Sequence, residues 1–190
     1  MKKMEYKAVV KAIEIISAYL IILSIMELVF IVSLLFTEIN VFPEILPLQE
    51  VIFSSDFIDI SGSILWIFLI ICMVFFLILG IHMLRFALNN KIESKSLAKY
   101  LVLLGMVILL GAFVKMDYLV LLGKTKIDTV LGSIPFQTAL YDSTITPLIA
   151  AVFWVFFISV IICFLITGLI VATAGIKWTL LIEREEPSNS

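Results

Sequence analysis

Three ionisable residues, Glu27, Lys115 and Asp117, fall within or at the end of long apolar segments, where charges are rare. Ser24 lies three residues before Glu27, so the two side chains share one face of a helix and can form a hydrogen bond. A charge at the centre of a membrane-crossing helix costs about 2.5–3.5 kcal/mol on insertion scales, and such residues usually face other helices or water. This intramembrane charged cluster is therefore the best candidate for a functional site.

The depths of Glu27 and Lys115 match if both of their helices start on the same side. Glu27 lies 15 residues beyond Ala12, which is roughly 22 Å along a helix axis, and Lys115 lies 16 residues beyond Lys99, roughly 24 Å. The Cα–Cβ bond of Lys115 tilts toward its helix N-terminus and so leans into the membrane. We therefore expect Lys115 to need a partner, and Glu27 is available at the same level.

Three interpretations of the cluster stay open from the sequence. The cluster can line a pathway for ions, protons or a substrate, with Asp117 nearby. It can also be a structural bridge that fixes the order of the helices, since buried pairs serve registry as well as transport. A third reading is that Lys115 and Asp117 only end their helix at the membrane surface. Gly111 and Ala112, one turn before Lys115, leave room for another helix to approach closely.

No other constellation in the sequence points to a reaction. Cys72 and Cys163 lie in apolar segments without a C-x-x-C pattern, so we expect two small buried side chains and neither redox chemistry nor zinc. His82 and Arg85 are one turn apart near a helix end, which is typical of contact with lipid headgroups. The single histidine cannot provide paired haem ligation. We therefore expect no catalytic residues, no metal and no cofactor.

The elements that position these residues follow from the composition. Of the 190 residues, 63% are hydrophobic and 15% are charged, against about 25% charged in an ordinary soluble domain. A soluble core of this size cannot hide so much apolar surface. The net charge of −2 gives no reason to expect a nucleic acid partner. The composition excludes a soluble enzyme and a disulfide scaffold and indicates an integral membrane protein.

Four apolar segments are long enough to cross a hydrocarbon core of about 30 Å, which takes about 20 helical residues. The expected spans are approximately residues 12–36, 62–88, 97–122 and 147–174, with the last helix continuing to about 181. Gly168 and Ala172 form a small-xxx-small pair in the last span, which predicts a helix contact within the chain or between protomers. We expect one all-α transmembrane domain over residues 1–190, an antiparallel four-helix bundle.

Basic residues predict the orientation. Ten of the thirteen lie in the N-terminal segment, the second connection or the C-terminal tail, whereas the first connection has five acidic residues and no basic one. The positive-inside rule therefore places both termini in the cytoplasm of a cell that carries the protein in its plasma membrane. The two outer loops, residues 37–61 and 123–146, have about 24 residues each, and loops this long usually have their own structure. We expect them to form a small outer cap, with β-leaning residues from Lys124 to Val130.

The function expected from these features is that of a non-catalytic multi-pass membrane protein. It would be an accessory or structural subunit, or an interaction partner, of a larger membrane complex. Its partners would be the lipid bilayer and other membrane protein subunits or further copies of itself. The alternative is a small oligomeric ion or proton channel or transporter that uses the Glu27–Lys115–Asp117 cluster. The apolar second span, with almost no polar residue, favours the first reading.

Overall fold

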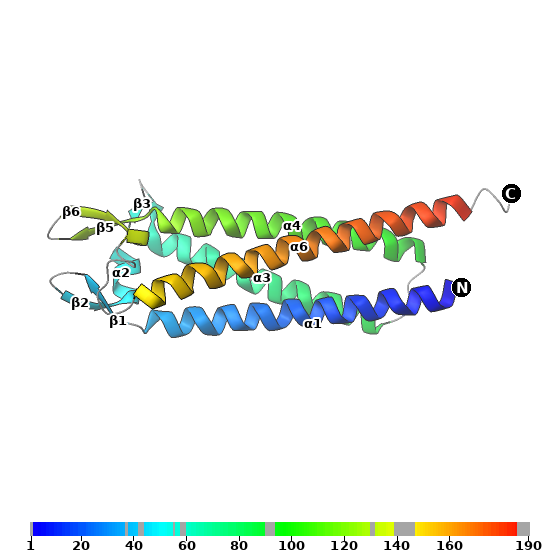
Figure 1. The fold of residues 1–190 in the computed structure, drawn as a ribbon, viewed down its shortest axis with the longest axis horizontal. Helices are drawn as coiled ribbons and strands as arrows, with labels where there is room; N and C mark the ends of the chain where they lie inside the picture. The colour runs from blue at the N-terminus through cyan, green and yellow to red at the C-terminus, as the bar shows by residue number, and fades with distance from the viewer. Residues whose placement is uncertain are drawn as a thin grey trace. The chain divides into compact units, whose positions relative to one another are not determined.

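The fold is described from a computed structural model of the chain (Figure 1). The structure describes residues 2–36, 38–41, 44–54, 56–57, 60–89, 94–129, 132–138 and 147–185. The part of the second outer loop from 139 to 146, for which the sequence analysis expects an ordered cap, lies outside the described residues. So does Glu93 in the second connection.

Four long helices contain the four apolar segments: α1 (Lys2–Leu35), α3 (Gly62–Leu88), α4 (Ser94–Gly123) and α6 (Pro147–Glu185). Each holds a stretch long and apolar enough to cross a membrane, namely Lys7–Leu35, Gly62–Leu88, Ser96–Gly123 and Val152–Leu180. These four helices identify a mostly helical, membrane-embedded protein. The expected second span has the same bounds as α3.

Three helices extend beyond the bounds expected from the sequence. The start of α1 is at Lys2 instead of about Ala12, α4 starts at Ser94 instead of Leu97, and α6 continues to Glu185. The extra residues are rich in Lys, Glu and Arg, which are good helix formers. Hydropathy therefore locates the apolar part of each helix but not its ends.

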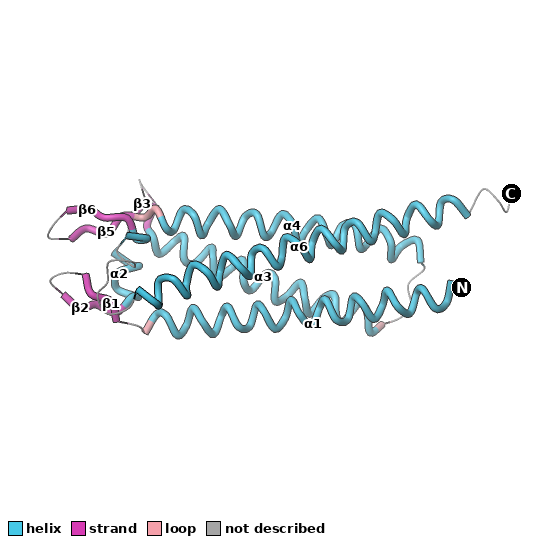
Figure 2. The backbone as a smooth tube through the Cα atoms, viewed as in Figure 1, coloured by secondary structure: helices cyan, strands magenta, loops and turns pink. Residues whose placement is uncertain are grey.

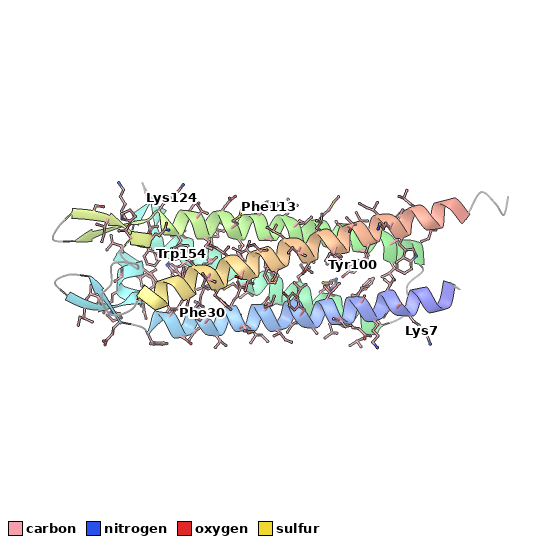
Figure 3. All side chains as sticks on the ribbon, viewed as in Figure 1. Lys7, Phe30, Tyr100, Phe113, Lys124 and Trp154 are labelled. Carbon is pink, nitrogen blue, oxygen red and sulfur yellow. The ribbon has the colours of Figure 1, made fainter. Side chains whose placement is uncertain are left out.

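The surfaces of the helices are apolar on their outer side. Large hydrophobic side chains with high exposed fractions recur along each span, for example Ile22 at 57%, Ile78 at 60%, Leu110 at 65% and Val155 at 64%. Figure 3 shows Phe113 pointing outward from α4, in agreement with its exposed fraction of 50%. In water such surfaces would be unfavourable, whereas in a bilayer they contact lipid tails.

Hydroxyl groups on the helices are satisfied by their own backbone. Ser33 donates to the Val29 carbonyl at 2.8 Å, Thr167 to the Cys163 carbonyl at 2.7 Å and Thr173 to the Leu169 carbonyl at 2.8 Å. These side chain to backbone bonds remove a donor that lipid could not satisfy. These three hydroxyl groups therefore each have an acceptor within their own helix.

The chain divides into two compact units. Unit 1 comprises Met1–Leu23, Phe76–Phe113 and Ile162–Ser190, and unit 2 comprises Ser24–Phe75 and Val114–Ile161. Each unit contains one part of every long helix. The two termini and the short connection between α3 and α4 belong to unit 1, whereas both outer connections belong to unit 2.

Small residues and aromatic rings hold the four helical segments of unit 1 together. Gly80 of α3 lies against Ile21 and Ser17 of α1, and the Phe86 ring of α3 stacks on Tyr100 of α4 with centroids 3.8 Å apart. Two further contacts come from α6. Its Gly168 approaches Gly105 of α4, and its Phe164 stacks on Phe76 of α3 at 4.2 Å.

Unit 2 contains the strands, which form two small antiparallel sheets (Figure 2). The first connection holds a hairpin of β1 (Glu38–Val41) and β2 (Glu44–Pro47), then α2 (Leu48–Ser54), β3 (Asp56–Phe57) and β4 (Ile60–Ser61). The second holds β5 (Lys126–Thr129) and β6 (Gly132–Pro135), which pair as a hairpin whose Gly132 has a φ of 117°. Only glycine adopts that conformation without strain.

One pairing joins the two outer connections. Strand β3 pairs with β5 through Asp56 and Lys126, so that the four-stranded sheet has the order β4-β3-β5-β6. The outer connections are thus small sheets plus a short helix, a refinement of the all-α expectation. Within the expected β-leaning segment, Lys124 to Val130, the strand occupies Lys126–Thr129.

Buried apolar side chains anchor these connections within unit 2. In α2, Leu48, Val51 and Ile52 have exposed fractions of 1% or less. Phe136, directly after β6, is fully buried and meets the Trp66 ring of α3 edge-on at 6.5 Å. The Phe136 amide also donates to the Thr125 carbonyl at 2.6 Å, which closes the β5–β6 hairpin against the end of α4.

Candidate functional site: an intramembrane ion pair

The most unusual feature of unit 2 is an ion pair inside the spans of α1 and α4. Lys115 donates a hydrogen bond from Nζ to Oε1 of Glu27, 88 residues away in sequence. Neither side chain has any exposed surface. The sequence placed these residues at one depth, and the structure brings their charged groups into contact.

Local sequence explains why both residues face inward. Along α1 the buried positions recur at Leu20, Ser24, Glu27, Ile31 and Leu34, the spacing of one helical face. Along α4 the same spacing joins Ile108, Ala112, Lys115, Leu119 and Leu122. Glu27 and Lys115 therefore occupy core positions on otherwise apolar faces, and each helix directs its charge toward the other.

The electrostatic surroundings of the pair include one further polar side chain. Cys72 of α3 lies close enough to interact electrostatically with both Lys115 and Glu27. Cys72 is half-buried and forms no disulfide. Three helices of unit 2, α1, α3 and α4, thus contribute to the site.

The carboxylate of Glu27 is incompletely bonded. Its Oε1 accepts from Lys115, whereas Oε2 is buried and has no hydrogen-bond partner among the described residues. An orphaned acceptor of this kind is expensive in a low-dielectric interior. The proximity of the Lys115 ammonium compensates the carboxylate charge, and the two charges neutralise each other.

The other two members of the predicted cluster, Ser24 and Asp117, lie on different helix faces relative to this pair. Ser24 is buried on the same face of α1 as Glu27, one turn earlier. Asp117 has an exposed side chain and lies about 200° around α4 from Lys115, because each residue turns a helix by about 100°. The structure therefore places Ser24 in the core with the pair and Asp117 on another face.

The predicted helix-packing residues lie in unit 1. Ala112 is fully buried and Gly111 is half-buried on α4. Gly168 and Ala172 are both buried on α6. A Cβ atom built at Gly168 would lie 2.9 Å from Cγ of Leu109, so a larger residue there would collide with α4.

Two glycines that the sequence analysis did not select belong to the same contact between α4 and α6. A Cβ atom at Gly105 would lie 2.7 Å from the Ala172 Cα, and one at Gly175 would lie 2.7 Å from the Val102 nitrogen. Gly105 is seven residues before Ala112, two helical turns along the same face. That spacing was the signal available in the sequence.

The remaining candidates form no further site in the described residues. His82 is exposed and its ring centroid lies 6.3 Å from that of Tyr100, and Arg85 is exposed nearby. Cys163 is half-buried and interacts with the Tyr19 hydroxyl across unit 1. In the part of the chain that the structure describes, no three His, Cys, Asp or Glu side chains gather as metal ligands would.

Comparison with known proteins gives no relative for this arrangement. No protein family, no curated protein and no solved structure matches the chain. The features that bear on function are therefore the geometry of the ion pair and that of the outer sheets.

Proposed function

We propose that this chain is a non-catalytic multi-pass membrane protein that acts as an accessory subunit or interaction partner in a larger membrane complex. In this proposal the Glu27–Lys115 pair is a structural clasp between α1 and α4. The protein contacts its partner through the outer connections of unit 2.

The observation that carries the proposal is the complete burial of both charged side chains. A pathway residue must exchange its partner for an ion, a proton or water, which needs access from one side of the membrane. Glu27 and Lys115 have no exposed surface and bind one another. This arrangement favours a structural role, in which the pair fixes the position of α1 relative to α4, over a role in transport.

The outer connections support a role in contacts. Outside the four spans, Ile45 of β2 and Phe53 of α2 have exposed fractions of 58% and 59%, although their neighbours Leu48 and Ile52 are buried. The strands at the ends of the four-stranded sheet, β4 and β6, each have one edge without a strand among the described residues. Exposed aromatic and aliphatic side chains are typical of interaction surfaces, and so are open strand edges.

A second candidate function is a small oligomeric ion or proton channel or transporter. One observation favours it, which is the unpartnered Oε2 of Glu27. A membrane-embedded carboxylate with a vacant acceptor can take up a proton when the structure opens. This candidate and the first one predict opposite results in a single flux measurement.

The test is reconstitution of the purified protein into liposomes, followed by measurement of proton and cation flux. The wild type, Glu27→Gln and Asp117→Asn are compared, because Asp117 is an exposed acid near Lys115 in sequence and provides the matched control. The first proposal expects no flux above empty liposomes for any of the three. Flux that Glu27→Gln abolishes and Asp117→Asn retains would establish the channel instead.

The proposed contact between the outer connections and a partner protein is tested by a separate experiment. A photo-crosslinking residue at Phe53 should trap the same protein that copurifies in fixed stoichiometry from the native membrane. The same residue at Phe113, on the lipid-facing side of α4, should not trap it. Purification without a stoichiometric partner, together with absence of crosslinking at Phe53, would contradict the proposal.

A further inference from the structure

A groove in unit 1 lies between the ends of α4 and α6. Its volume is about 420 Å³, within the range of small-molecule sites, and it is lined by Lys99, Val102, Ile176, Thr179 and Leu180. Lys99 and Val102 are one turn apart on α4, and Ile176, Thr179 and Leu180 share one face of α6. The lining is mostly apolar, with one cationic group at its edge.

The groove opens where the close contact between α4 and α6 ends. Gly168, Ala172 and Gly175 bring the backbone of α6 against α4 over two turns. The next residues on that face, Ile176 and Thr179, are larger than glycine and alanine and line the groove. The Thr179 hydroxyl donates to the Gly175 carbonyl at 2.9 Å, which turns the polar atom toward its own helix and leaves its methyl group for the groove.

The level of the groove corresponds to the edge of both spans. Lys99 is three residues inside the start of the span Ser96–Gly123, and Leu180 is the last residue of the span Val152–Leu180. Trp178, half-buried beside Thr179, is a residue type enriched at the headgroup level. A groove at this level has the lipid headgroups at one end and the acyl chains along its length.

The exposed charged side chains of unit 1, among those that the structure describes, are all basic: Lys7, Lys11, Arg85, Lys99 and Lys177. The acid of this unit whose side chain the structure describes, Glu14, is half-buried. Basic pockets between transmembrane helices bind anionic lipid headgroups. The surroundings therefore attract a lipid with a net negative charge more strongly than a zwitterionic one.

We propose that this groove binds one anionic glycerophospholipid, with its phosphate on the Lys99 ammonium and an acyl chain against Val102, Ile176 and Leu180. The charged end and the apolar length of the groove match the two parts of this ligand. A soluble phosphate compound would satisfy Lys99 but would leave the apolar lining unused.

The test uses the full chain purified in detergent, with bound lipid measured by native mass spectrometry. Dioleoyl phosphatidylglycerol should bind with one tight site, and dioleoyl phosphatidylcholine should bind more weakly. Lys99→Gln should weaken phosphatidylglycerol binding about fivefold, the effect of one basic residue near a lipid phosphate. Lys177→Gln, which removes an exposed charge two residues from Thr179 but outside the groove, should weaken this binding less than Lys99→Gln does.

Two further arms make the assignment specific. Ile176→Trp fills the groove without changing charge and should displace the tightly bound lipid, while an unchanged melting temperature verifies that the variant is folded. Glycerol 3-phosphate, which has the charge but no acyl chain, should not compete. Equal weakening by Lys99→Gln and Lys177→Gln, normal binding in Ile176→Trp, or competition by glycerol 3-phosphate would each overturn the proposal.

Discussion

The Lys115 ammonium is bonded to the Glu27 carboxylate, and the two side chains are wholly buried between α1 and α4. These helices are separated in sequence by α3 and by the first outer connection, so local structure does not bring the two residues together. The pair therefore forms only when the tertiary structure of unit 2 brings α1 and α4 together. It also makes the stability of that arrangement sensitive to either charge.

Removal of one partner should destabilise the protein more than removal of both. Glu27→Ala removes the acidic partner of the buried Lys115, and a broken buried pair costs about 3–5 kcal/mol. Glu27→Leu combined with Lys115→Met replaces the pair with apolar groups and should restore most of the loss. Unfolding in mixed detergent and denaturing micelles, followed by circular dichroism, measures both. If the double variant were as unstable as Glu27→Ala, the ion pair would add net stability to the fold beyond the neutralisation of its own two charges.

The contact between α4 and α6 should tolerate no side chain at Gly105. A Cβ atom there would lie 2.7 Å from both the Cα and Cβ of Ala172, so Gly105→Leu must force the helices apart. Overpacking of this kind costs about 1–3 kcal/mol. Ala174→Leu, on an exposed face of α6, provides the control and should be neutral. The melting temperatures of the two purified variants in detergent decide the point.

The outer sheets should loosen when Phe136 is truncated. Phe136 is fully buried, and Phe→Ala in a core costs about 3–5 kcal/mol. Hydrogen exchange followed by mass spectrometry should show faster exchange in β5 and β6 for Phe136→Ala. Phe53→Ala, which removes a side chain with an exposed fraction of 59%, should leave these strands protected. Unchanged exchange in Phe136→Ala would mean that β5 and β6 are held by their hydrogen bonds alone.

The orientation inferred from the positive-inside rule is open to direct labelling. In a variant without Cys72 and Cys163, a cysteine at Lys124 should react with an impermeant maleimide added to intact cells. A cysteine at Arg85 should react only after permeabilisation, since it lies at the end of α3 that leads to the short connection. Both native residues are exposed, so the two sites differ in sidedness rather than in burial. The reverse labelling pattern would invert the orientation.

Part of this architecture could be predicted from single residues and their spacing. The uninterrupted apolar run from Gly62 to Leu88 predicts a membrane-spanning helix. The bounds of α3 agree with those of this run. The start of α1 was missed because Lys2, Lys3 and Glu5 are hydrophilic but form helices well. Depth along the membrane normal depends only on counting residues, which is why Glu27 and Lys115 could be placed at one level.

Other features depend on rotation and register, which a single sequence does not specify. Which face of α4 meets α6 follows from the packing of all neighbours, so Gly105 was not selected although Gly111 and Ala112 were. Asp117 was grouped with Lys115 by depth, but a separation of two residues places it on another face of the helix. The pairing of β3 with β5 joins short segments 70 residues apart, Asp56 and Lys126, and neither has a strong strand pattern.

The sheet order β4-β3-β5-β6 has a consequence for biosynthesis. Strand β3 leaves the ribosome before α3 and α4, whereas its neighbour β5 is made only after α4. When α3 and α4 are both inserted, the chain returns to its starting side and the two strands can meet, whereas insertion of one helix alone leaves them on opposite sides. Completion of the sheet therefore requires that α3 and α4 insert as a pair. A chain in which α3 inserted and α4 failed to insert would leave the β3 edge without its β5 neighbour.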